Sequence, residues 1–219
     1  MCIATNAINK EFLASVFWHG TCFIISEYLC VTVLNNVAQV FWHLSLVVAG
    51  GGGMVMDIRL TRIDDRLIHG QVATVWSKAT GIERILVVSD EVANDELRKF
   101  LLKQAAPPGI KSNVVTKRKL VEVYRDQLFD GMKVMLLFAS PQDVVEVVQS
   151  GVDLKSVNIG GMRFSEGKKM ITNFISMDED DIKCFVELAN SGVELEIRQV
   201  PTDRKTDLIQ LIKKEKMLQ

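Results

Sequence analysis

The sequence lacks most of the motifs that identify a particular chemistry. None of its four cysteines forms a CxxC pair, and only one of its three histidines, His69, follows residue 43. We therefore expect neither a disulfide framework nor a metal site in the body of the chain. The glycine-rich patterns GxxxxGK[ST] and GxGxxG, which mark nucleotide sites, do not occur. The GxSxG turn that carries the nucleophile of many hydrolases does not occur either.

A strong net charge is also missing. Lysine and arginine number 26 against 27 acidic residues, so the net charge is −1, and a nucleic-acid partner is not expected. Hydrophobic residues make up 48% of the chain, which places it among globular proteins. A chain of 219 residues is long enough for one substantial hydrophobic core.

Residues 1–55 differ from the rest because they are almost uncharged. They contain only three charged residues, and none occurs between positions 28 and 56. A membrane helix is an alternative here, but polar interruptions and the lack of flanking basic residues argue against it. Gly50–Gly53 directly precedes Met54 and Met56, as a translated ribosome-binding site would. We predict that residues 1–55 are an N-terminal extension, either a mis-assigned start or disordered, ahead of one domain at 56–219.

In that domain, strand and helix patterns alternate. Apolar runs predict strands at 84–90, 112–116, 133–138, 156–159 and 193–200. One helix is expected to bury Leu97, Phe100 and Leu101, and the last helix is expected at 203–216. The arms 164 and 169–175 flank Ser165–Lys168, which predicts a hairpin. The predicted fold class is α/β: an open, mainly parallel twisted sheet with helices on both faces and an antiparallel hairpin at one edge.

The segment from Arg62 to Val72, RIDDRLIHGQV, holds the strongest candidate site. It predicts a strand, a polar loop and a helix that buries Val72, Val75, Trp76 and Ala79, with His69 and Gly70 at its entrance. We assign Gly70 and Gln71, at the start of this helix, to phosphate or substrate binding. Backbone N–H groups at such an entrance can bind phosphate. Asp64 or Asp65 could hold one imidazole nitrogen while the other acts as nucleophile, and Arg62 and Arg66 could bind phosphoryl oxygens. The structural alternative is a solvated ion-pair cluster.

A second candidate segment is Asn158-Ile-Gly-Gly161, after a predicted strand. Gly160 and Gly161 would let the backbone approach a ligand closely, and we assign Asn158, Gly160 and Gly161 to phosphate or substrate binding. The structural alternative is a turn that leads into the hairpin. In parallel sheets the polar groups at the carboxyl ends of strands meet in one cleft, so both segments are expected there.

The RIDDRLIHGQV segment resembles the active-site segment of enzyme IIB of the mannose–fructose–sorbose class of the bacterial sugar phosphotransferase system. Val87–Asp95, Ala106–Gly109, Met135–Phe138 and Asn158–Met162 are similar to the same family, in the same order. The resemblance covers about residues 56–219. It implies a protein-N(pi)-phosphohistidine–sugar phosphotransferase in which a phosphohistidine of the IIA component phosphorylates His69. His69 then phosphorylates a hexose-type sugar delivered by the membrane subunits IIC and IID.

The resemblance also implies roles and partners that the residue pattern does not supply. His69 is the phosphorylated nucleophile, and Asp65, Arg62 and Arg66 orient the imidazole and bind the phosphoryl group. No cofactor is implied; the expected location is the cytoplasm, peripherally at the permease, and a homodimer is a family-level expectation. Two alternatives stay open: a non-catalytic α/β ligand-binding domain, and a regulatory domain phosphorylated on Asp64, Asp65 or Asp90. Mannose, fructose, sorbose and N-acetylgalactosamine are all compatible with the loop.

Overall fold

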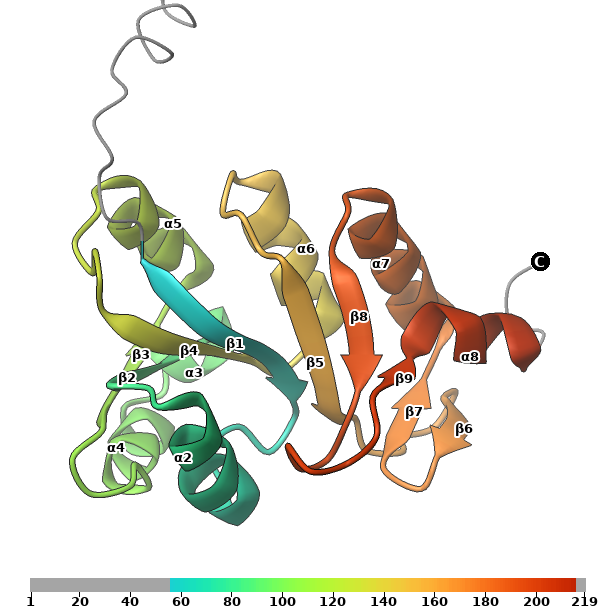
Figure 1. Cartoon of the computed structure of the whole chain (residues 1–219), viewed down its shortest axis with the longest axis horizontal. Helices are drawn as coiled ribbons and strands as arrows, with labels where there is room; N and C mark the ends of the chain where they lie inside the picture. Colours follow the sequence, from blue (N-terminus) through green and yellow to red (C-terminus); the bar gives the residue numbers. More distant parts are fainter. Residues whose placement is uncertain (1–55, 216–219) are drawn as a thin grey trace, which may run out of the picture. The chain divides into compact units, whose positions relative to one another are not determined.

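The computed structural model of the chain describes residues 56–215 (Figure 1). The predicted extension at 1–55 lies outside these residues. None of the helices in residues 56–215 is long and apolar enough to span a bilayer. The elements, in chain order, are β1 (Asp57–Asp64), η2 (Val72–Trp76), α2 (Ser77–Thr80), β2 (Arg84–Val88), α3 (Asp90–Ala93), α4 (Glu96–Gln104), β3 (Lys111–Val115), α5 (Lys117–Arg125), β4 (Lys133–Phe138), α6 (Pro141–Gln149), β5 (Ser156–Gly161), β6 (Lys169–Thr172), β7 (Ile175–Met177), α7 (Glu179–Asn190), β8 (Glu194–Ile197), β9 (Thr206–Asp207) and α8 (Leu208–Lys214).

The main sheet has the strand order β3-β2-β4-β1-β5-β8-β9. All neighbours pair in parallel except β9, which runs antiparallel to β8 at the edge. Strands β6 and β7 form a separate antiparallel pair, which lies near the β8–β9 edge (Figure 1). The predicted α/β class, with a mainly parallel sheet and an antiparallel hairpin, is confirmed.

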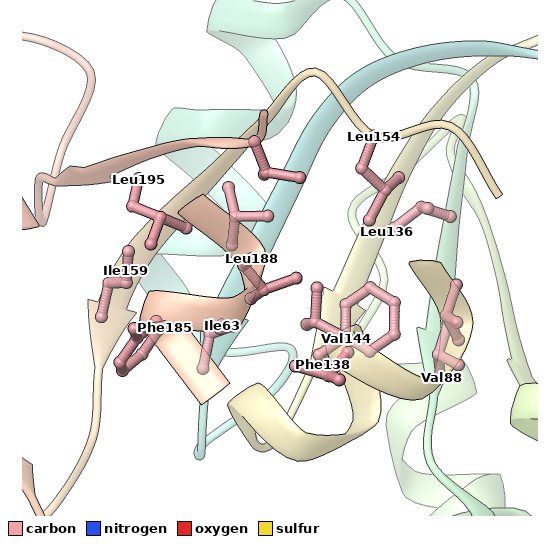
Figure 2. Packing of buried hydrophobic residues seen from close by; sticks show 14 of the residues in the cluster. Ile63, Val88, Leu136, Phe138, Val144, Leu154, Ile159, Phe185, Leu188 and Leu195 are labelled. Carbon is pink, nitrogen blue, oxygen red and sulfur yellow. The ribbon is translucent and has the colours of Figure 1, made fainter. Parts of the chain in front are cut away.

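Each face of the sheet is covered by its own hydrophobic cluster. In β4, Val134, Leu136 and Phe138 belong to one cluster while Met135 and Leu137 belong to the other. This division follows from the alternation of side chains along a strand. The first cluster packs under α5, α6, α7 and α8, and Figure 2 shows part of it. The second packs under η2 and α3, with Leu102 of α4 against it. A strand that is buried on both faces must be apolar throughout, which is why β2 and β4 read as unbroken apolar runs.

Several details of the sequence prediction were wrong. The chain reverses at Asn173-Phe174, between β6 and β7, and not at Ser165–Lys168. The last helix begins at Leu208, because Thr206-Asp207 is taken up by the edge strand β9. The three apolar residues expected to bury one face of α4 stay more than half exposed: Leu97, Phe100 and Leu101.

The helix after the candidate loop also differs from its predicted pattern. Val72 and Trp76 are buried as expected, but Val75 is 39% exposed and Ala79 lies at the surface. Residues Val72–Trp76 are wound as a π-helix, which turns through fewer degrees per residue than an α-helix and so changes which side chains face the core. The helix ends at Gly81, whose φ of +61° is the left-handed conformation common at helix C-caps.

Candidate functional site

The candidate site lies at the carboxyl ends of β1 and β5, which are neighbours in the sheet. The chain leaves β1 towards β2 on one side and leaves β5 towards β8 on the other, so this is a point where the strand order switches direction. Ligands of open α/β sheets bind at such points. Asp64, the last residue of β1, pairs with Gly161, the last residue of β5, so the two predicted segments do meet.

A tight turn brings His69 back over the end of β1. The Leu67 N–H donates to the Asp64 carbonyl at 2.8 Å, and Leu67 itself has φ +58°, a left-handed conformation that few non-glycine residues adopt. Its side chain is buried, which helps to hold this backbone in place. Such strained residues cluster at functional sites. His69 immediately precedes the helical residues 70–80, as predicted, and its side chain is 18% exposed.

Asp64 is the centre of the site. Its fully buried carboxylate accepts hydrogen bonds from Arg62 Nη2 at 2.8 Å, from His69 Nε2 at 2.9 Å and from Arg66 Nε at 3.1 Å. Burial alone raises the pKa of this carboxyl, but the hydrogen bonds from His69 and Arg66 and the charge of Arg62 outweigh it and hold the pKa well below its usual range. Asp64 is therefore ionised and can only accept hydrogen bonds.

This geometry determines the tautomer of His69. Because the ionised Asp64 carboxylate accepts, His69 Nε2 must carry a proton. In the neutral imidazole the lone pair then lies on Nδ1. The site therefore holds an imidazole with a fixed donor on one side and a nucleophilic nitrogen on the other.

Arg62 supports Asp64 from inside the protein. Its side chain is fully buried, and Nη1 donates to the Asn158 side-chain oxygen and, at 3.1 Å, to the Arg198 carbonyl. The guanidinium also lies 5.3 Å from the centre of the Trp76 ring, a cation–π distance. Burial lowers the pKa of Arg62, and the neighbouring Asp64 carboxylate opposes that shift. A guanidinium enclosed in this way faces protein groups, so this arrangement does not favour the predicted phosphoryl contact from Arg62, which stays a prediction.

The paired glycines make room for this ion pair. A Cβ on Gly160 would lie 1.8 Å from the Arg62 guanidinium carbon, and one on Gly161 would lie 3.1 Å from Asp64 Oδ1. Asn158 is buried beside them and accepts from Arg62. Gly160 and Asn158 were predicted to bind phosphate or substrate, but the structure places them around buried Arg62, and Gly161 beside Asp64. The close approach that the glycines permit is to a side chain of the protein.

The other predicted residues occupy more exposed positions. Asp65, one of the two aspartates predicted as a partner of the imidazole, instead accepts from Arg163 Nε at 3.1 Å, because successive residues at the end of a strand point to opposite sides. Arg66 is half exposed, so it can bind Asp64 and still face solvent. Gly70 is exposed and Gln71 half-buried, both at the helix entrance as expected.

Sequence reasoning missed the roles of Trp76, Arg198 and Gln199, and it did not choose between Asp64 and Asp65. Trp76 was assigned to the core, but its indole N–H donates to the Gln199 carbonyl at 2.8 Å and its ring contacts both Arg62 and Arg198. The central role of Asp64 could have been found from the strand pattern, because Arg62 and Asp64 stand two residues apart and so share one side of β1. The contacts from Arg198 and Gln199 carry no local sequence signal.

Comparisons with known proteins converge on one family. A family model described as "PTS system sorbose subfamily IIB component" matches residues 58–219. The mannose-specific EIIAB component of Escherichia coli K12 is 53% identical over 159 residues, which are 73% of this chain and 49% of that protein. This chain thus spans about half the length of that relative.

Two further relatives are matched over nearly their whole length. The sorbose-specific EIIB component of Lacticaseibacillus casei is 49% identical over 154 residues, covering 70% of this chain and 94% of that protein. The crystal structure of the IIB domain of the sorbose permease from Klebsiella pneumoniae has a TM-score of 0.71 and 47% identity, covering 73% of this chain and 98% of that one.

Proposed function

The chain belongs to the sorbose subfamily of IIB components of the phosphotransferase system, and we propose that it accepts a phosphoryl group on His69 Nδ1 and passes it to a hexose-type sugar. The observation that carries the choice of atom is the 2.9 Å contact between His69 Nε2 and the ionised Asp64 carboxylate. That contact leaves Nδ1 as the nucleophile. The functional domain is residues 56–219, in keeping with the match of the family model to 58–219.

The transfer needs no proton to leave His69. The Nδ1 lone pair attacks phosphorus, the Nδ1–P bond forms, and the bond between phosphorus and the donor histidine breaks. Nε2 keeps its proton against Asp64, and the carboxylate balances the positive charge that appears on the phosphorylated imidazole. In the second transfer a sugar hydroxyl attacks phosphorus, the hydroxyl proton leaves to solvent or a partner group, and His69 returns to its neutral form.

Arg66 supplies charge stabilisation on the outside of the site. Its Nε and Nη2 bind Asp64, whereas its Nη1 makes no hydrogen bond to any residue between 56 and 215. The half-exposed guanidinium is thus free on one side for a phosphoryl oxygen. Phosphoryl transfer is catalysed mainly by such positioning and charge stabilisation. No cofactor takes part.

The partners follow from the family. The donor is the phosphohistidine of a IIA component, and the acceptor sugar is delivered by membrane subunits IIC and IID. The domain acts in the cytoplasm at the inner side of this permease, as a monomer or a homodimer. A site at the carboxyl ends of β1 and β5 can present one histidine to two partners in turn.

A reconstituted relay with labelled phosphoenolpyruvate tests the proposal. The wild-type chain should take up label that is stable in base and labile in acid, and His69→Ala should take up none while keeping the wild-type fold by circular dichroism. Nitrogen-15 NMR of the phosphorylated chain should place phosphorus on Nδ1. Label that persists in His69→Ala, or that is released by hydroxylamine, would favour an aspartyl phosphate and overturn the proposal. Full burial of Asp64 already disfavours it as such an acceptor.

A further inference from the structure

A cavity of about 470 Å³ opens beside Arg66, between the turn that follows β1 and the β6–β7 hairpin. Its buried floor includes Gly161, Met162 and Ser176. It is continuous with the candidate active site through Asp65 and Arg66, which line it. Cavities of this size suit small-molecule ligands. The phosphoryl relay itself requires only His69 and its supports, so the relay leaves this cavity without a role.

Part of the cavity lining offers cationic donors. Arg66 directs Nε and Nη2 to Asp64, and Arg163 directs Nε to Asp65 at 3.1 Å. Among residues 56–215, neither Arg66 Nη1 nor the two terminal nitrogens of Arg163 has a hydrogen-bond partner. Arg163 is 85% exposed and can turn towards a ligand. Two guanidinium groups in the lining of one cavity suit a phosphate group, to which their free N–H groups can donate.

The cavity is also lined by aromatic rings and side-chain amides. Phe164, which is 60% exposed, and the half-buried Phe174 line it together with Asn173 and Gln199. An exposed phenylalanine beside a cavity is a surface on which the C–H face of a sugar ring can pack. The side-chain amides of Asn173 and Gln199 can both donate and accept, which suits ring hydroxyls. Apolar walls with a few polar groups are typical of small-molecule sites.

We propose that this cavity binds a hexose phosphate, with the phosphate at Arg66 and Arg163 and the sugar ring against Phe164. The choice of ligand rests on the proposed function, whose product is a sugar phosphate. Because Arg66 would serve both the phosphate in the cavity and the phosphoryl group on His69, bound product slows rephosphorylation of His69. The domain thereby senses the product of its own reaction.

Titration of the full-length, unphosphorylated chain by NMR tests the site. The probes are mannose 6-phosphate, fructose 1-phosphate, the two free sugars and inorganic phosphate, all at constant ionic strength. At least one sugar phosphate should cause saturable shifts at Asn173 and Gln199, and inorganic phosphate should bind about tenfold more weakly, a difference of about 1.4 kcal/mol. Phe164→Ala should weaken the sugar phosphate by a similar factor. Phe100→Ala, which removes a ring that is 58% exposed on α4, is the matched control and should bind normally.

Each contrary result has a defined meaning. Equal binding of inorganic phosphate reduces the site to an anion site, and no saturable shift with either sugar phosphate overturns the inference. If Phe164→Ala slows transfer from the IIA component but leaves ligand binding unchanged, the surface docks a protein and the inference fails. His69→Ala separates the two proposals: it should keep sugar-phosphate binding and lose phosphorylation. Phosphorylation that persists in His69→Ala counts against His69 as the acceptor. If instead the wild-type chain is phosphorylated normally but binds no sugar phosphate, only the cavity proposal fails.

Discussion

The side chain of Arg62 on β1 fills the space beside Gly160 on β5: a Cβ on Gly160 would lie 1.8 Å from the guanidinium carbon of Arg62. The two residues are 98 positions apart, but neighbouring strands place them side by side. The guanidinium cannot simply move aside, because it is buried and bonded to Asp64, Asn158 and the Arg198 carbonyl. Gly160, which the sequence pattern assigns to ligand binding, thus makes room for the side chain that supports the Asp64 carboxylate.

Gly160→Ala should therefore disrupt the site from a position without catalytic chemistry. The added methyl group must displace Arg62 from Asp64, and we expect a loss of about 3 kcal/mol in the free energy of unfolding, measured by urea denaturation. Phosphoryl uptake should fall sharply in the same variant. Gly161→Ala is the graded comparison: its Cβ would meet Asp64 Oδ1 at 3.1 Å, so its cost should be clearly smaller. Equal stability of Gly160→Ala and wild type would show that Arg62 can be rearranged.

Asp64→Asn should destabilise the protein more than Asp65→Asn does. It leaves the buried Arg62 without its counter-ion, which we expect to cost about 3–5 kcal/mol of stability. It should also remove the Nε2–H preference of His69, which nitrogen-15 shifts of the ring report directly. Asp65→Asn is the matched control for stability, because its partner Arg163 is 85% exposed; its cost should stay below about 1 kcal/mol. The reverse order of the two losses would contradict the assignment of Asp64 as the centre of the site.

The stability of the domain should fall in acid through Asp64. The folded protein holds the pKa of Asp64 below its usual range, so the folded state favours the ionised form. The resulting stabilisation is fully present above about pH 4, the ordinary pKa of an aspartate, and is lost as pH falls below that value. Urea denaturation at pH 7, 5, 4 and 3 should show a steeper decline for wild type than for Asp64→Asn. Parallel curves would mean that other carboxylates account for the acid sensitivity.

Trp76→Phe should weaken the support for Arg62 without opening a large cavity. The substitution removes the 2.8 Å hydrogen bond to the Gln199 carbonyl and reduces the cation–π contact with Arg62 and Arg198. We expect a loss of about 1–2 kcal/mol by thermal denaturation, together with slower phosphoryl uptake. Tyr124→Phe removes only a 3.4 Å contact with the Asp153 N–H, and should change stability by less than about 0.5 kcal/mol. Similar losses of stability for both variants would show that the hydrogen bond and cation–π contacts of Trp76 contribute little.

Much of the fold was predictable because its signals are local. The apolar runs of β2 and β4 identify strands buried on both faces, and Ser140-Pro141 marks the start of α6, where the Ser140 side chain caps the helix. Predictions failed where tertiary context decides. Leu97 and Phe100 have helical spacing, but no part of the described fold covers them, and β9 exists only because β8 offers it an edge.

The sequence by itself determined the α/β class and the strand–turn–helix segment, and it singled out His69 as the candidate acceptor, because each depends on residue type and short spacing. Only the tertiary structure decided that Asp64 and not Asp65 holds the imidazole, since this depends on where β1 ends and how the turn at Leu67 is wound. It also decided that Arg62 is buried and that Gly160 makes space for it. The register between β1 and β5 brings those residues together, and no spacing along the chain encodes that register.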